Sequence, residues 1–139
     1  MQVTLREVNR LDAKMLYHLL GERPKLANIS HHKMPTFEFH EQFVMNHPYD
    51  KWYIIEAPTL GSSRDVGSVS ITSRNEIGIG ILKKFHRLGY AQSAIKELMH
   101  LCPRLSYYAN ISPRNVYSVK MFKKMGFDML QYTLKKGDV

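Results

Sequence analysis

The spacing of apolar and polar positions changes along the chain, and these changes predict its secondary structure. Four stretches repeat apolar residues at helical spacing, with capping or breaking residues at their ends, and predict helices: 10–20, 37–45, 90–102 and 113–125. Six stretches alternate apolar and polar residues or are rich in β-branched and aromatic ones, and predict strands: 2–8, 51–57, 66–72, 76–82, 105–111 and 128–134. Residues 22–35 are poorly periodic and predict a loop.

The order of these elements, β-α-α-β-β-β-α-β-α-β, predicts an α/β fold with a mixed sheet and helices on its faces. A chain of 139 residues that is 44% hydrophobic suits a single domain spanning residues 1–139. No apolar run approaches the roughly 20 residues that span a membrane, and the N-terminus lacks an apolar signal core, so we expect a cytoplasmic protein. The single cysteine, Cys102, excludes an internal disulfide, and no ligand cluster for a structural metal is visible.

The strand predicted at 76–82 has two unlike faces. Three isoleucines point to one side, whereas Gly78 and Gly80 leave the other side nearly bare. Because glycine weakens a strand, such a pair often marks the close approach of a ligand or of another backbone. Ordinary sheet packing is the alternative explanation.

The positive charge is confined to the last two fifths of the chain. Residues 1–82 contain nine Lys/Arg and nine Asp/Glu, whereas residues 83–139 contain eleven Lys/Arg and three acids, so this part carries the whole net charge of +8. A nucleic acid, an anionic membrane surface or a polyphosphate ligand could exploit that field. A solvated basic face without any ligand explains the charge equally well.

The stretch His86–Ala91, HRLGYA, lies between a predicted strand and a predicted helix. A helix start offers unpaired N–H groups and the positive end of the helix dipole, which together favour an anion. Gly89 would let the backbone approach that anion, and nearby residues add positive charge: Lys83, Lys84, His86 and Arg87. The spacings of the Walker loop and of the dinucleotide fingerprint are both absent. Taken alone, the stretch fits either a phosphate loop or an ordinary turn.

Two motifs in succession resemble the acyl-CoA-dependent N-acetyltransferases of the GNAT superfamily. The family's [Gln/Arg]-x-x-Gly-x-[Gly/Ala] loop stands here as His86-Arg87-Leu88-Gly89-Tyr90-Ala91, with histidine at the first position. The segment ISPRNVYSVKMFKKMGF, residues 111–127, resembles the family's next strand end and helix, with Asn115 and Ser118 in their usual places. The resemblance covers nearly the whole chain and is strongest over residues 66–127.

This resemblance implies the GNAT fold: a mixed, mostly antiparallel central sheet with a splayed parallel strand pair and about four flanking helices. It implies acetyl-CoA as cosubstrate and no metal. The pantetheine arm would enter between strands 76–82 and 105–111, and the pyrophosphate would lie on residues 86–91. The cofactor-binding residues implied in this way are Ile81, Leu82, Lys83, His86, Arg87, Leu88, Gly89, Tyr90, Ala91, Asn115 and Ser118.

The implied reaction is direct attack of a primary amine on the thioester, through a tetrahedral intermediate that backbone N–H groups stabilise. A protonated amine must first lose a proton, and Glu76 opens the central strand where related enzymes often carry a carboxylate base. The tyrosine that many members use to protonate the thiolate is replaced here by Phe122. Ser118, Tyr108 or solvent could supply that proton instead.

The acceptor stays open at this level. Residues 29–56 loosely resemble the acceptor side of enzymes that acetylate a nucleotide-linked amino sugar, and ribosomal-protein-type members are also similar. A protein N-terminus or lysine is the alternative acceptor; a polyamine is less favoured because the acids are scattered. A non-catalytic CoA-binding domain and a basic nucleic-acid binder belong to other classes, although no nucleic-acid motif supports the latter. We expect no membrane partner, and a monomer or homodimer.

Overall fold

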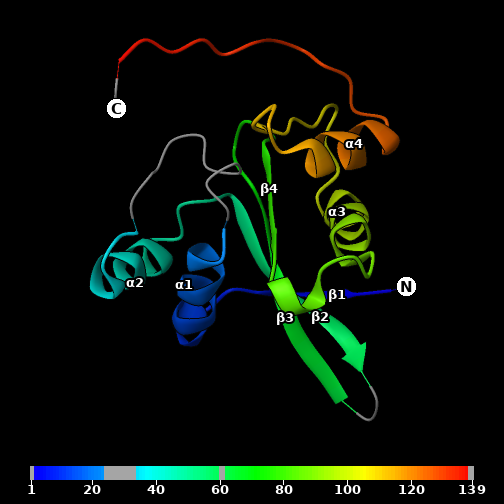
Figure 1. The fold of residues 1–139 in the computed structure, drawn as a ribbon. Coiled ribbons are helices and arrows are strands. Elements are labelled where there is room, and N and C mark those ends of the chain that lie inside the picture. Colours follow the sequence, from blue (N-terminus) through cyan, green and yellow to red (C-terminus); the bar gives the residue numbers. More distant parts are fainter. Residues whose placement is uncertain (1, 24–33, 60–61, 138–139) are drawn as a thin grey trace.

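A computed structural model describes residues 2–23, 34–59 and 62–137. Four strands form one antiparallel sheet in sequential order: β1 (Thr4–Glu7), β2 (Lys51–Thr59), β3 (Ser62–Ile71) and β4 (Ile77–Ile81). Four helices accompany them: α1 (Ala13–Gly21), α2 (Phe37–Met45), α3 (Tyr90–Leu101) and α4 (Val116–Lys124). The helices α1 and α2 lie on one side of the sheet and α3 on the other, with α4 above α3 at one end of β4 (Figure 1). The predicted α/β fold is confirmed.

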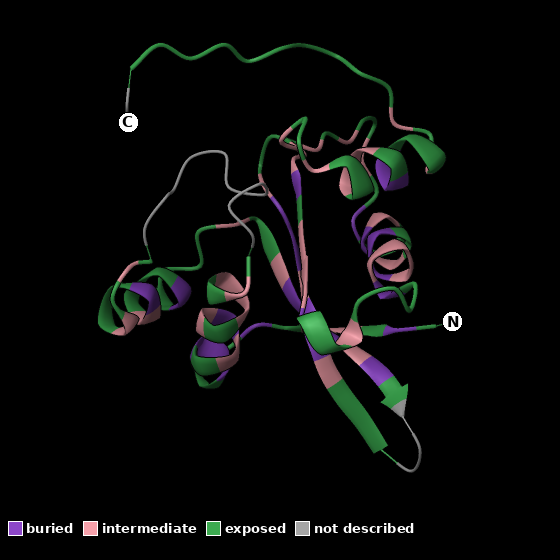
Figure 2. Ribbon diagram, viewed as in Figure 1, coloured by how far each residue is buried: buried purple, intermediate pink, exposed green. Residues whose placement is uncertain are grey.

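The sheet is buried on both faces in its middle, as the continuous apolar run of β2 requires (Figure 2). Tyr53, Ile55 and Ala57 join the larger core on the α3 side, together with Ala94, Ile95 and Leu98 of that helix. Ile54 points the opposite way and packs with Leu16 of α1 and Val44 of α2. Because successive strand side chains alternate between faces, one strand contributes to both cores.

The helix starts follow the capping residues that the sequence offers. Asn9 and Asp12 form a reciprocal capping box at a short 3₁₀ turn (Arg10–Asp12) that leads into α1. The Thr36 side chain accepts from the backbone N–H of Phe39 at the start of α2, and Asn115 accepts from the N–H of Ser118 at the start of α4. By contrast, the first turn of α3 has no side-chain cap, and Gly89 precedes it in the left-handed region at φ 83°.

Two of the six predicted strands are wrong in extent. Residues 105–111 pair with β4 only through an isolated parallel bridge between Glu76 and Tyr108. Residues 128–134 form no strand, because they leave α4 as an exposed extended segment that does not lie beside the sheet (Figure 1). The turn predicted at 61–65 is also too long, since Ser62–Asp65 already pair with β2. The alternation of these segments indicates their extended backbone correctly but does not determine which neighbour they pair with.

The glycines of β3 and β4 answer to packing rather than to open space. A Cβ on Gly80 would lie 3.3 Å from Leu19 of α1, and one on Gly78 would lie 2.9 Å from the Ser70 hydroxyl. Across the ladder, a Cβ on Gly67 would lie only 2.1 Å from the Gly80 carbonyl oxygen. The bare face that the sequence predicts is therefore covered at Gly80 by a helix of the same chain.

We expect Gly67→Ala to destabilise the fold by about 1–3 kcal/mol, because the backbone of β4 must move to admit the methyl group. Gly21→Ala is the matched control: its Cβ would meet only the flexible end of Met34 at 3.5 Å, and alanine favours a helix. Urea unfolding of the two variants measures the difference. Equal stabilities would show that the strands separate at no cost.

Candidate active site

The open edge of β4 is defined by the alternation of its backbone hydrogen bonds. Leu82 donates its N–H to Val66, and Thr72 donates to Glu76, so the even-numbered residues between them face β3. The N–H of Ile77 faces the other way and donates to the Tyr108 carbonyl at 2.7 Å. By the same alternation, Ile79 and Ile81 direct their backbone groups toward the edge where residues 109–111 have left the strand. This edge is where an extended ligand could pair as an additional strand.

Glu76 lies at the point where the two segments separate. Tyr108 places its N–H on the Asn75 carbonyl at 2.9 Å and its carbonyl on Ile77, so the bridge is centred on Glu76. The Glu76 carboxylate accepts from the Thr72 hydroxyl at 3.2 Å and from the Asn110 amide at 2.9 Å. The predicted base is thus held in one orientation by a residue from each flanking segment.

A second set of contacts fixes the segment that carries Tyr108 and Asn110. The Arg104 guanidinium donates to the Asn75 side-chain oxygen at 2.7 Å and forms an ion pair with Asp50 at 2.5 Å. The Tyr107 hydroxyl accepts from the Arg104 N–H at 2.9 Å and donates to the Cys102 carbonyl at 2.7 Å, at the end of α3. Sequence reasoning missed Arg104, Asn75 and Asn110, because their significance depends on contacts between separate loops.

The end of β4 is already hydrogen-bonded within the chain. The His86 Nε2 lies 2.7 Å from the Ile81 carbonyl oxygen, so this nitrogen carries the proton and donates. Lys83 donates its N–H to the Glu22 carboxylate at 2.8 Å, and this bond lowers the pKa of Glu22. Since Leu82 is paired with Val66, the groups predicted to bind pantetheine have partners here, and the N–H of Ile81 is the one that the ladder turns outward.

Residues 86–89 form an exposed loop directly before α3. Arg87 and Gly89 both have left-handed backbone, at φ 65° and 83°, and the following helix begins without a side-chain cap. The Tyr90 ring is buried against Phe85, so Tyr90 could contribute only backbone to a ligand there. Leu88 is exposed and Ala91 is half-buried. This arrangement offers backbone N–H groups and positive charge to an anion.

The helix α4 presents the residues that the sequence places opposite this loop. Ser118 is half-buried in its first turn, with its N–H on the Asn115 side-chain oxygen at 3.3 Å. Phe122 is only 4% exposed, and its ring packs against Phe127 with centroids 5.0 Å apart. The position at which relatives carry a tyrosine is therefore part of the core in this chain. Tyr108, by comparison, is 41% exposed.

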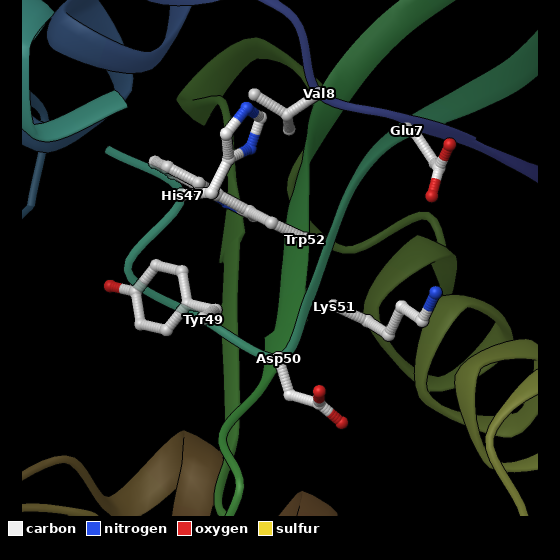
Figure 3. Close-up of a pocket in the computed structure, with 7 residues that line it drawn as sticks. All are labelled: Glu7, Val8, His47, Tyr49, Asp50, Lys51 and Trp52. Atoms are coloured by element: carbon white, nitrogen blue, oxygen red, sulfur yellow. The ribbon is translucent and has the colours of Figure 1, made fainter. Parts of the chain in front are cut away.

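Two surface hollows lie outside this edge. One of about 240 Å³ surrounds the start of β2, where the rings of Tyr49 and Trp52 meet nearly at right angles beside His47 and Asp50 (Figure 3). The other, about 370 Å³, lies along α1 and is lined by Lys14, Tyr17, His18, Gly21, Glu22 and Met34. Only the second adjoins β4, because Glu22 binds the Lys83 backbone. In the described parts, no cluster of His, Cys, Asp or Glu could hold a metal ion, and no helix is suited to crossing a bilayer.

Comparison with known proteins agrees with this geometry. The family model described as an acetyltransferase (GNAT) domain matches residues 2–128. A domain from Methanocaldococcus jannaschii superposes with a TM-score of 0.78 at 20% identity, covering 95% of this chain and 92% of that one. The spermidine N-acetyltransferase of Vibrio cholerae, solved with CoA and spermine, gives 0.80 at 18% identity, covering 99% and 88%. No curated protein matches the sequence.

The chain belongs to the GNAT acetyltransferase family, as its two motifs predict. It is an N-acetyltransferase, an enzyme that transfers an acetyl group to an amine, and members of this family use acetyl-CoA as the donor. The predicted GNAT fold is confirmed by the match and by the superpositions. The site residues and the acceptor are not identified by these comparisons and stay predictions.

His40, a histidine near the predicted acceptor side, gives a test by pH. It is 6% exposed between Tyr17 and Phe43, and among the described residues its Nε2 has no partner. Burial lowers its pKa, so the unfolded chain binds a proton more readily and stability falls as the pH drops through about 6.5. We expect His40→Phe to remove that part of the loss, measured as Tm at pH 7.5 and 5.5. The surface variant His100→Phe should keep it, and equal pH dependence in both would contradict the assignment.

Proposed function

We propose that the chain acetylates the primary amine of a nucleotide-linked amino sugar, with Glu76 as the general base, and that residues 1–139 form one N-acetyltransferase domain. The observation that carries the proposal is the orientation of Glu76. Its carboxylate is fixed by Thr72 and Asn110 where the β4 edge becomes free, beside the groups that would meet the thioester. A carboxylate there can take the amine proton directly or through one water.

The donor is held by backbone groups in this proposal. Pantetheine amides would pair with the open edge at Ile79 and Ile81, and the pyrophosphate would lie on residues 86–91 at the start of α3. The outward N–H of Ile81 is suited to stabilising the oxyanion of the tetrahedral intermediate. Leu82 and Lys83 would serve as neighbours of this edge, since their own N–H groups already have partners.

The leaving thiolate needs a proton, and Phe122 cannot supply it. Tyr108 is the side chain best placed for the role, because its backbone flanks Glu76 and its side chain is partly exposed. Ser118 is the alternative on α4. With a thiol pKa near 8.5, solvent can also protonate the thiolate.

Charge supports an anionic acceptor. The net charge of +8 attracts a nucleotide diphosphate and repels a polycation over long range. A polyamine is the second candidate: the Vibrio cholerae enzyme with a similar fold carries that acceptor in its name, and Glu22 offers a carboxylate in the hollow along α1. A protein N-terminus or lysine is the third.

A thiol-release assay with acetyl-CoA and a panel of amines tests the function. We expect turnover with a nucleotide-linked amino sugar to exceed turnover with spermidine or with a peptide amine. Glu76→Gln should lower kcat about 10²–10⁴-fold, because the amide keeps the contacts but cannot take a proton.

The matched control is Glu56→Gln, a change of equal charge on β2 in which Glu56 pairs with Arg6 outside the site. It should leave kcat unchanged. If Glu76→Gln retains the kcat and pH profile of the native chain, Glu76 is not the base. If no amine of the panel is acetylated, the proposed acceptor is wrong.

The backbone loop predicts which changes weaken CoA binding. We expect His86→Ala to leave the Kd for CoA within about threefold, because the histidine contacts Ile81 rather than the outer face of the loop. Gly89→Val should weaken binding about tenfold, because a side chain at φ 83° costs about 1–2 kcal/mol in the loop conformation. Isothermal titration calorimetry measures both. A tenfold loss in His86→Ala would instead assign the phosphate contact to its side chain.

A further inference from the structure

The segment after α4 has the sequence of a half-buried strand but no neighbour. In DMLQYTL, residues 128–134, apolar side chains recur at every second position: Leu130, Tyr132 and Leu134. Their exposed fractions are 71%, 82% and 92%. Residues 128–137 are all exposed, and none of the described residues forms a backbone hydrogen bond with them. Three large apolar side chains on one face of an extended segment are a costly arrangement in water.

The start of this segment is anchored, which fixes its direction. Phe127 donates its N–H to the Phe122 carbonyl at 3.0 Å and packs its ring against Phe122. Gly126 turns the chain with φ 96°, and the segment then runs away from the sheet without a further reversal (Figure 1). No glycine or proline follows until Gly137, so nothing in residues 128–134 favours a turn back onto the same molecule.

A matching vacancy lies on residues 105–111. Tyr108 directs both backbone groups toward β4, so alternation directs those of Tyr107 and Ala109 to the opposite side. Among the described residues, these groups have no strand partner on that side. The side chains of Tyr107, Ala109 and Ile111 pack only partly against the core, so its apolar surface reaches the same edge. Both segments span seven residues, about 23 Å each when extended.

We propose that residues 128–134 of one molecule pair as a strand with residues 105–111 of a second copy, in a reciprocal exchange. A two-fold symmetric dimer satisfies both vacant edges at once, because the same patch and the same segment occur on each copy. The apolar face of the added strand would continue the partly covered core at Tyr107 and Ile111. The exchange would also support the wall that carries Tyr108 and Asn110, so the partner copy would complete the support of the candidate site.

Light scattering on the purified full-length chain tests the exchange. We expect a mass of about 32 kDa, twice the 16.2 kDa of one chain, and a Tm that rises with protein concentration. A chain truncated after Phe127 should be a folded monomer whose Tm is independent of concentration. The truncation removes only exposed residues of the single chain.

A pair of charge variants separates the apolar face from mere loss of solubility. Leu130→Asp with Leu134→Asp should give a monomer, because the charges would enter the partner's core. Gln131→Asp with Thr133→Asp adds equal charge on the opposite face and should leave the dimer intact. A monomeric full-length chain, or a dimer that survives the truncation or the Leu130/Leu134 variant, would overturn the proposal. If that variant does not fold, the truncated chain decides.

Discussion

The candidate site depends on two backbone hydrogen bonds, those by which Tyr108 holds residues 105–111 to the start of β4. One bridge is enough to align the segments but too little to keep them parallel, so they diverge immediately afterwards. Arg104, clamped between Asn75 and Asp50, secures the joined end. The separation therefore begins at a fixed point, and Glu76 is located at that point.

The remaining parts of the site are arranged around the same strand. Its odd-numbered residues supply an edge for the donor, its C-terminal end leads into the basic loop, and its N-terminal end carries the carboxylate. The helices on the two faces differ in their tasks: α3 receives the loop at its uncapped start, whereas α1 packs on Gly80 and borders a hollow. One short strand can thus position donor, base and acceptor without a metal cluster in the described parts.

Local patterns in the sequence predict the four helices, four of the strands and the family, because caps, breakers and periodicity act over a few residues. They fail where the outcome depends on distant partners. Residues 105–111 and 128–134 alternate like β3, yet each lacks a neighbour along most of its length. The glycines of β4 show the same limit, since Leu19 occupies the space that the sequence reserves for a ligand. Asn110 and Arg104 carry no motif, and only the fold brings them to Glu76 and Asn75.

The contact between Glu22 and the Lys83 N–H joins the last turn of α1 to the residue after β4. It fastens a helix from one face of the sheet to the strand end that leads into the anion loop on the other. Displacement of that backbone is consequently transmitted to α1 and to the hollow beside it by a single hydrogen bond. The two substrate-facing sides of the molecule thus share a mechanical link, and occupancy of one side can be sensed at the other.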